Sequence, residues 1–166
     1  MSPAPDNIAF LGAEDVRELD ALLARYLVDT RARSALLLDR SGRLLTAAGD
    51  LGDLDQTTFA SLAAGDFAAS DQLAAHLGEP EFTSLYHHGR AHSMFLADVG
   101  GTVILAVLFD QRTTLGMIRV RTRQVVPVCA ALFEQLRLRG PRGSLIHLES
   151  GWAAEAESEI DRLFRD

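Results

Sequence analysis

The chain has 166 residues, of which 48% are apolar, and its formal net charge is −7. This size suits one domain with a substantial core, and the acidic balance argues against nucleic acid or an anionic membrane as the main partner. All sixteen basic residues are arginine, and the absence of lysine from the sequence excludes P-loop, Schiff-base and pyridoxal chemistry.

The hydrophobic pattern divides the chain into helices and strands. Two strands that follow the first helix are joined at Gly42, and a second helix opens at Asp53 and stops at Gly78. Glycines separate three further strands, and a third helix contains Pro127, which should bend it. Helices are expected over 13–30, 57–77 and 114–137, and strands over 34–39, 43–49, 82–88, 92–99 and 102–110.

The order of these elements is α-β-β-α-β-β-β-α, with hairpins in place of βαβ crossovers. This order predicts an α+β fold, sandwich-like, in which helices pack on a mostly antiparallel five-stranded sheet. The strand over 102–110 is apolar at seven consecutive positions, so it should lie at the centre with both faces covered.

The last part of the chain differs from the rest in composition. We expect a domain over 1–138, a linker over 139–151 and a short acidic helix over 152–166. A helix of this length is marginal alone, so we expect it to become ordered by docking on a partner. Its apolar stripe is formed by Ile160, Leu163 and Phe164.

Three features of the sequence bear on localisation. The N-terminus has no basic stretch followed by an apolar run, so we expect no signal peptide. The longest apolar run, Val103–Phe109, is too short to span a bilayer. A single cysteine, Cys129, suits a reducing compartment. We therefore expect a cytoplasmic protein.

The stretch LFDQRTTLGMIRVRTRQ (108–124) has the outline of a phosphate-binding loop, since a strand leads through a glycine into a basic helix start. A Walker A loop, however, needs two glycines and a lysine around the phosphates. Here only Gly116 is present, so we expect it to pack the helix start against the sheet. Arg112 could act as an arginine finger on a partner, but arginines 112, 119, 121 and 123 are better explained as a solvated helix face.

Other chemical motifs are weak. His87 and His88 are adjacent on a strand and point to opposite faces, so with His92 they are a poor metal site. Cys129 has no Cys-x-x-Cys partner and is interpreted as a core thiol. The sequence holds no G-x-S-x-G elbow. We therefore expect no catalytic residues, no cofactor and no metal.

The second helix is the unusual element, because ten of its nineteen positions over 57–75 are Ala, Gly or Ser. Helical spacing predicts a core face formed by Phe59, Leu62, Ala69, Leu73 and Leu77. A second face is flat and almost uncharged, which favours a partner interface. A plain alanine-rich helix of high propensity is the alternative. The predicted interface residues are Ser61, Ala64, Gly65, Ala68, Gln72 and Ala75.

The element order, the stretch SLAAGDFAAS and the stretch VLFDQRTTLGMIRVR together resemble the Roadblock/dynein-light-chain superfamily. Within it, the chain is most similar to the MglB family of bacterial regulators, which act on Ras-like GTPases of the MglA type. The resemblance covers about residues 8–138, and the ending EIDRLF is also similar to the tails of that family.

This resemblance implies a homodimer whose sheets join edge to edge, with the two copies of the second helix side by side. It implies that one dimer binds one GTP-loaded GTPase, positions that GTPase's own catalytic residues without a trans arginine finger, and so stimulates hydrolysis. The role would lie in bacterial cell polarity and gliding motility, at a cell pole. The contact set would be the second-helix face, and from the tail Ile160, Leu163 and Phe164, where the tail helix in some members also promotes nucleotide exchange.

Two other functions are compatible with the same features. Roadblock dimers also serve as passive scaffold subunits, and sheet-and-helix modules of this size can be small-molecule sensors. A sensor should have an apolar cavity with convergent polar groups, for which the sequence gives no clear indication.

Overall fold

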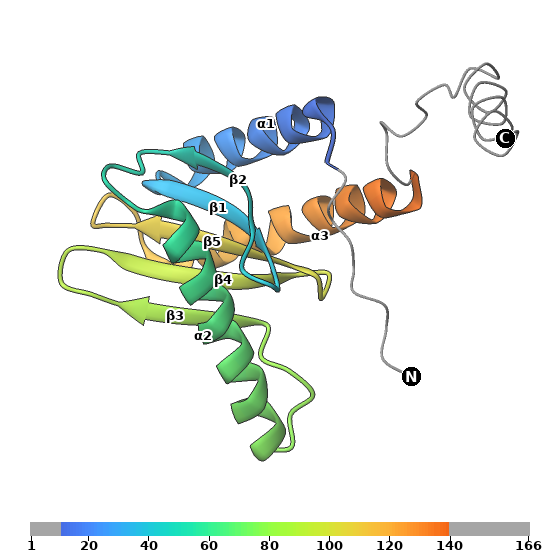
Figure 1. Ribbon diagram of the computed structural model, residues 1–166. Coiled ribbons are helices and arrows are strands. Elements are labelled where there is room, and N and C mark those ends of the chain that lie inside the picture. The colour runs from blue at the N-terminus through green and yellow to red at the C-terminus, as the bar shows by residue number, and fades with distance from the viewer. Residues whose placement is uncertain (1–10, 140–166) are drawn as a thin grey trace, which may run out of the picture.

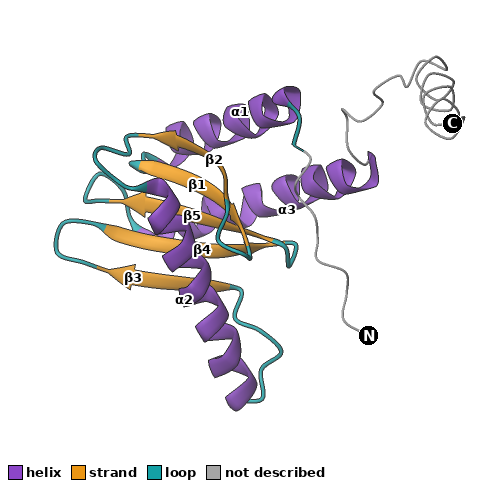
Figure 2. Ribbon diagram, in the orientation of Figure 1, coloured by secondary structure: helices purple, strands orange, loops and turns teal. Residues whose placement is uncertain are grey.

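The computed structural model describes residues 11–139 and places five strands in one sheet. The elements are α1 (Ala13–Thr30), β1 (Ser34–Asp39), β2 (Leu44–Gly49), α2 (Gln56–His76), β3 (Ser84–His88), β4 (Ser93–Val99), β5 (Val103–Phe109) and α3 (Leu115–Arg139). The strand order is β2-β1-β5-β4-β3, and every neighbouring pair is antiparallel. Helices α1 and α3 lie on one face of the sheet and α2 crosses the other (Figures 1 and 2). The predicted α+β class and element order are confirmed.

Strand β5 is the centre of the sheet, as its apolar sequence predicts, because it pairs with both β1 and β4. Its side chains alternate between the two layers. Leu105 and Val107 belong to the core under α1 and α3, whereas Ile104 and Ala106 belong to the core under α2. Two separate hydrophobic cores therefore hold the helices on their respective faces.

The layer of α1 and α3 contains two buried groups that can ionise. The hydroxyl of Tyr26 on α1 shares a hydrogen bond of 2.8 Å with the Thr122 hydroxyl on α3. Cys129 is buried in the same core, which confirms it as a core thiol. Burial raises the pKa of Tyr26 to about 12, although the Thr122 hydrogen bond lowers it, and burial raises the pKa of Cys129 to about 12.

These shifts predict a loss of stability in alkali. In the unfolded chain Cys129 and Tyr26 ionise near 9.0 and 10.0, so between these values and about 12 the unfolded chain releases protons that the folded one retains. Stability is therefore intact below pH 9 and falls as pH rises toward 12. At a pH of about 10.5, ionisation of Cys129 in the unfolded chain should lower the free energy of unfolding by about 2 kcal/mol. Urea titrations of wild type and Cys129→Val at pH 8 and 10.5 measure this, and equal losses in both proteins would contradict it.

Helix α3 is continuous from Leu115 to Arg139 and contains Pro127, which lies on its exposed side. The proline has no N–H to donate to the carbonyl of Arg123, so one helical hydrogen bond is missing there. The bend expected at Pro127 stays a prediction. Within residues 11–139, every helix is too short or too polar to cross a bilayer.

Candidate partner-binding site

Helix α2 is held on the sheet by small residues and one aromatic ring. Phe67 is completely buried at its middle, and alanines above and below it let the helix approach the strands closely. The N-terminal end is fixed by Asp55, whose carboxylate accepts the N–H of Thr58 at 3.1 Å, so the expected start at Asp53 is wrong by two residues. The buried residues of α2 are Ala60, Ala63, Ala64, Phe67, Ser70 and Ala74.

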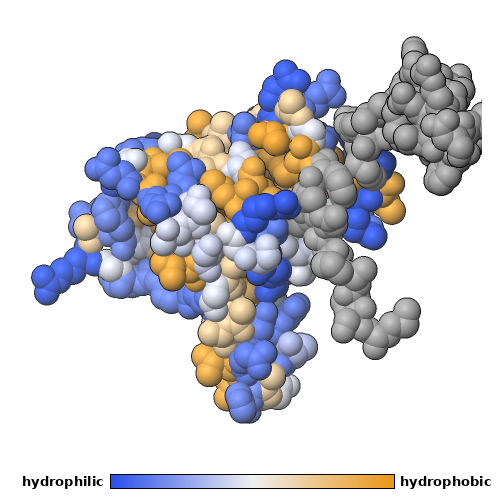
Figure 3. Space-filling model, viewed as in Figure 1, coloured by the Kyte–Doolittle hydropathy of each residue, from blue (hydrophilic) through white to orange (hydrophobic). Residues whose placement is uncertain are grey.

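The predicted core face of this helix is wrong. Leu62, Leu73 and Leu77 are 69%, 59% and 72% exposed, Ala69 is exposed, and only Phe59 packs partly against the core. These three leucines, here called the leucine stripe, follow one side of α2. Figure 3 shows hydrophobic surface on the projecting end of this helix. Hydrophobicity alone favours the leucines for the core, but the ring of Phe67 occupies the core face and needs the space that the small residues leave around it.

Five of the six residues predicted for the partner face do lie together. Ser61, Gly65, Ala68, Gln72 and Ala75 are all exposed and form a second exposed stripe of α2, about a third of a turn around the helix from the leucine stripe; they are here called the small face. Ala64 is buried, at the edge of the small face that borders the core. The other predicted contacts, Ile160, Leu163 and Phe164, lie outside the described residues.

Ala64 is small because it packs against a turn of its own protomer. Gly42, in the turn between β1 and β2, adopts a φ of +89° and lies directly under α2. A Cβ at Gly42 would lie 2.8 Å from the Cα of Ser61 and 3.5 Å from the Cβ of Ala64. The turn and the helix therefore need a glycine facing small residues, which explains Ala64 without any partner.

A charged cluster fixes the orientation of α2 on the sheet. Arg40, at the end of β1, donates to Asp71 on α2 at 2.9 Å and also to Asp98 on β4. Its guanidinium lies 4.6 Å from the centre of the Phe67 ring. At the other side, His87 on β3 hydrogen-bonds Asp66 on α2 at 2.6 Å. Helix α2 is thus tied to Arg40, just after β1, and to His87 on β3, so its orientation on the sheet is fixed.

Gly65 is the residue of the small face at which no contact within the protomer requires a glycine. It lies in mid-helix, where glycine is unfavourable, and a Cβ there would meet nothing within 4 Å. We predict that Gly65→Ala raises the free energy of unfolding by about 0.5–1 kcal/mol and weakens the binding of a partner that packs closely on this helix. Chemical denaturation measures the first effect and a binding titration the second. If the variant is more stable but binds the partner as wild type does, Gly65 is not part of the contact surface.

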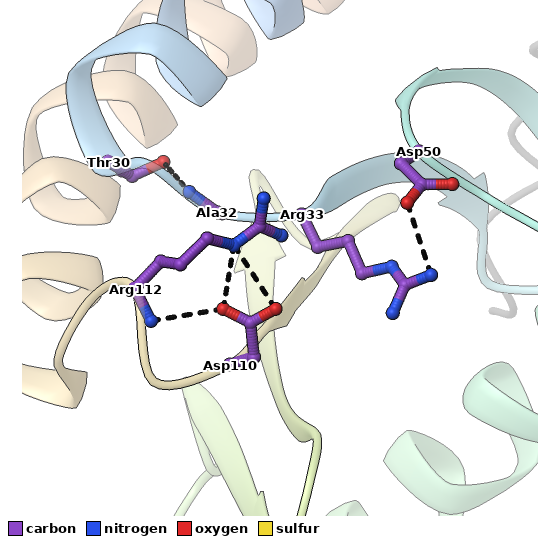
Figure 4. Close-up of polar contacts among 6 residues, drawn as sticks. All are labelled: Thr30, Ala32, Arg33, Asp50, Asp110 and Arg112. Atoms are coloured by element: carbon purple, nitrogen blue, oxygen red, sulfur yellow. Dashed lines mark hydrogen bonds and ion pairs between the residues drawn. The ribbon is translucent and has the colours of Figure 1, made fainter.

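Arg112 lies in the loop before α3, so it is not part of the predicted helix face with arginines 119, 121 and 123. Its Nε donates to both carboxylate oxygens of Asp110, at 2.9 and 3.2 Å, and its backbone N–H donates to one of them at 3.0 Å (Figure 4). These bonds lower the pKa of the Asp110 carboxyl. Arg33 and Asp50 form a second pair nearby, at 3.1 Å. The arginine is therefore folded back on its own loop.

His87 and His88, in the β3–β4 hairpin, have side-chain partners. Besides the His87–Asp66 bond, Nδ1 of His88 lies 3.1 Å from both the Tyr86 and the Ser93 hydroxyls. In the described part of the chain, no three His, Cys, Asp or Glu side chains are placed to hold a metal ion.

Both edge strands of the sheet, β2 and β3, pair with a single neighbour among residues 11–139, and β3 is the more exposed of the two. Strand β3 pairs only with β4, and four of its five residues are exposed. An unpaired edge presents free N–H and C=O groups, which can add a strand from another chain. This edge and the leucine stripe lie on the same side of α2, because Asp66, which reaches His87 on β3, is on that side of the helix.

An α+β module with a five-stranded antiparallel sheet, one helix crossing one face and an open β3 edge is the architecture of Roadblock domains. The family model "Roadblock/LC7 domain" matches residues 18–109, and the chain belongs to this family. No curated protein sequence gives a significant match.

Solved structures place the chain near the MglB proteins. It is 37% identical to MglB from Myxococcus xanthus, covering 72% of this chain and 97% of that one with a TM-score of 0.69. It is 27% identical to the gliding protein MglB from Thermus thermophilus, covering 82% and 100% with a TM-score of 0.72. A Roadblock/LC7 domain from Streptomyces avermitilis, 18% identical over 69% of this chain and 97% of that one, shares the fold with a TM-score of 0.64. The predicted resemblance is confirmed.

Proposed function

We propose that this protein is a homodimeric regulator of a Ras-like GTPase of the MglA type, which it binds in the GTP state and whose GTP hydrolysis it stimulates. The observation that carries the proposal is the small face of α2, which is exposed and uncharged on a helix that Arg40 and Phe67 fix to the sheet. A partner can pack closely on such a side without burying a charge. The similarity to MglB proteins supports the choice of partner and a role in cell polarity and gliding motility, at a cell pole in the cytoplasm.

The proposed homodimer joins two sheets through β3. The leucine stripe supports this arrangement, because burial of a leucine side chain contributes about 1.5–3 kcal/mol and an edge-to-edge sheet would bring the two copies of α2 close together. A related structure is described as MglB with tetrameric arrangement, and it is 27% identical to this chain. In the dimer, the two small faces would form one surface for a single GTPase.

Stimulation would work by positioning. A regulator that holds its partner's catalytic residues in their active arrangement needs a rigid surface and no nucleophile, base or metal of its own. The bonds of Arg112 to Asp110 support this mechanism over a trans arginine finger, because they would have to break before the side chain could reach a phosphate. The regulatory character of the Roadblock family agrees with a protein that is not itself an enzyme.

The C-terminal segment is proposed as a second contact with the GTPase. The predicted linker over 139–151 would join the domain over 1–138 to a helix over 152–166, although its first residue, Arg139, is the last of α3. The apolar residues of that helix, Ile160, Leu163 and Phe164, would grip the GTPase, and the same contact would give the helix an exchange-promoting role.

Nucleotide-dependent binding tests this function. The protein is mixed with its MglA-type GTPase loaded with either GDP or a non-hydrolysable GTP analogue, and the complexes are sized by light scattering. We expect a complex of one GTPase with one dimer in the GTP-analogue sample only. Equal binding of both nucleotide states, or none, would contradict the proposal.

A further inference from the structure

Arg40 is held between the sheet and α2 by its main chain, its guanidinium and a ring contact. Its backbone N–H donates to the carbonyl of Thr102 at 3.3 Å, which fixes its main chain to the β4–β5 turn. Its guanidinium donates to Asp71 on α2 and to Asp98 on β4, and it lies 4.6 Å from the centre of the Phe67 ring. A planar guanidinium can bond carboxylates and stack on a ring at the same time.

The acids on either side of Arg40 differ in what else holds them. Asp98 also accepts the N–H of Gly101 at 2.9 Å, so its carboxylate is fixed by a turn of the sheet. Asp71 has no other hydrogen-bond partner among the described residues, and its Oδ1 is buried. The Arg40–Asp71 bond, at 2.9 Å, is therefore the polar link by which the sheet sets the position of this side of α2.

This link borders the small face. Asp71 lies three residues after Ala68 and four residues before Ala75, and residues at these spacings are neighbours on the surface of a helix. The bond between His87 and Asp66 lies on the other side of α2, next to the leucine stripe. A displacement of Asp71 would therefore move the small face directly.

We infer that Arg40 is a positioning residue for the stimulation of GTP hydrolysis, and that it acts through Asp71 and α2. This inference rests on the proposed function, because it assigns Arg40 a part in that same activity. The side chain of Arg40 is only 28% exposed and its guanidinium bonds within the protomer, so it sets the small face in place without itself being part of it.

Positioning and binding respond differently to a loosened helix. A misplacement of about 1 Å in a group that positions reacting atoms can cost about a hundredfold in rate. The affinity of a flat, uncharged surface depends mainly on non-directional contacts, which tolerate a small tilt. Loss of the Arg40–Asp71 link should therefore lower the stimulated rate much more than it lowers the affinity for the GTPase.

The link can be cut from either end. Arg40→Ala removes the guanidinium, and Asp71→Ala removes the carboxylate of α2 while Arg40 stays paired with Asp98. Alanine is the best helix former, so Asp71→Ala should fold even if Arg40→Ala does not. The control is Arg33→Ala, because Arg33 is 32% exposed and pairs at 3.1 Å with Asp50, which lies outside α2.

Amide hydrogen exchange of the protein without GTPase measures the link itself. We expect the amides of residues 68–76 to exchange at least about threefold faster in Arg40→Ala and Asp71→Ala than in wild type, because local opening of α2 becomes easier. Exchange in α1 should not change, and Arg33→Ala should exchange in α2 as wild type does. Unchanged exchange of α2 in both link variants would overturn the inference.

Single-turnover hydrolysis by the GTPase, at increasing concentrations of each protein, separates positioning from binding. We expect each link variant to keep less than about a third of the wild-type acceleration at saturation, with a half-saturating concentration within about threefold of the wild-type value. Arg33→Ala should match wild type in both quantities.

The same titrations distinguish failure of the inference from failure of the proposed function. If wild type accelerates hydrolysis and the link variants reach the same rate at saturation, Arg40 has no positioning role. A rise in the half-saturating concentration alone would make Arg40 and Asp71 contacts with the GTPase, and an equal loss in Arg33→Ala would point to general destabilisation; both results overturn the inference. No acceleration by wild type would contradict the proposed function itself, and this role of Arg40 with it.

Discussion

Ala68→Arg is expected to abolish binding of the GTP-loaded GTPase while leaving the protein folded and dimeric. Ala68 is exposed near the middle of the small face, so an arginine there disturbs no packing within the protomer. In the complex it would hold two flat surfaces apart and bury an unpaired charge. The expected loss is about 3 kcal/mol or more, which is a weakening of over about a hundredfold.

The control for this variant is Ala24→Arg, an equally simple change at an exposed alanine of α1 on the opposite side of the sheet. It should bind the GTPase as wild type does. Isothermal titration gives the affinities and light scattering the dimer mass. Normal binding by Ala68→Arg would show that the small face is not the contact surface, and a monomeric variant would assign Ala68 to the dimer interface instead.

Phe67→Ala should produce the largest loss of stability among the substitutions in α2. The ring is completely buried among small residues that cannot move in to fill its space, and Arg40 stacks on it. We expect a loss of about 3–5 kcal/mol in the free energy of unfolding, and a melting temperature lower by roughly 10 °C. Phe67→Leu, which keeps most of the volume, should lose about 1.5 kcal/mol or less. Equal losses in the two variants would show that packing around Phe67 does not hold α2.

The fold could be predicted because local sequence patterns specify its helices and strands. Glycines separate the strands into hairpins, and the run Val103–Phe109 predicts a central strand, which β5 is. Hairpin connections leave few alternatives to an antiparallel sheet. The remaining errors are of one or two residues at element ends, as at Asp55, where several polar residues compete to cap the same helix.

The orientation of α2 could not be predicted from its sequence. Apolar and small residues occupy nearly every side of this helix, so periodicity selects no single core face. The actual choice is decided by tertiary packing, in which the turn at Gly42 and the ring of Phe67 need small neighbours. The leucine stripe, assigned to the core from its hydrophobicity, is on the surface because the sheet beneath α2 admits only a close approach.

The exposure of the small face could be predicted for a related reason, whereas its role as a contact surface stays a prediction. Ser61, Gly65, Ala68, Gln72 and Ala75 are exposed as a set because they share one side of the helix and carry no charge. Ala64 met the same criteria, but its position between that side and the core is set by the β1–β2 turn. A sequence pattern cannot distinguish a residue that is small for its own fold from one that is small for a partner.

The most direct test of the proposed function is single-turnover GTP hydrolysis by the MglA-type GTPase, with and without this protein at a saturating concentration. We expect wild type to accelerate hydrolysis at least about tenfold, which is about 1.4 kcal/mol of barrier, and Ala68→Arg to give the rate of the GTPase alone. An unchanged rate in the presence of wild-type protein that demonstrably binds the GTPase would contradict activation and leave a scaffold.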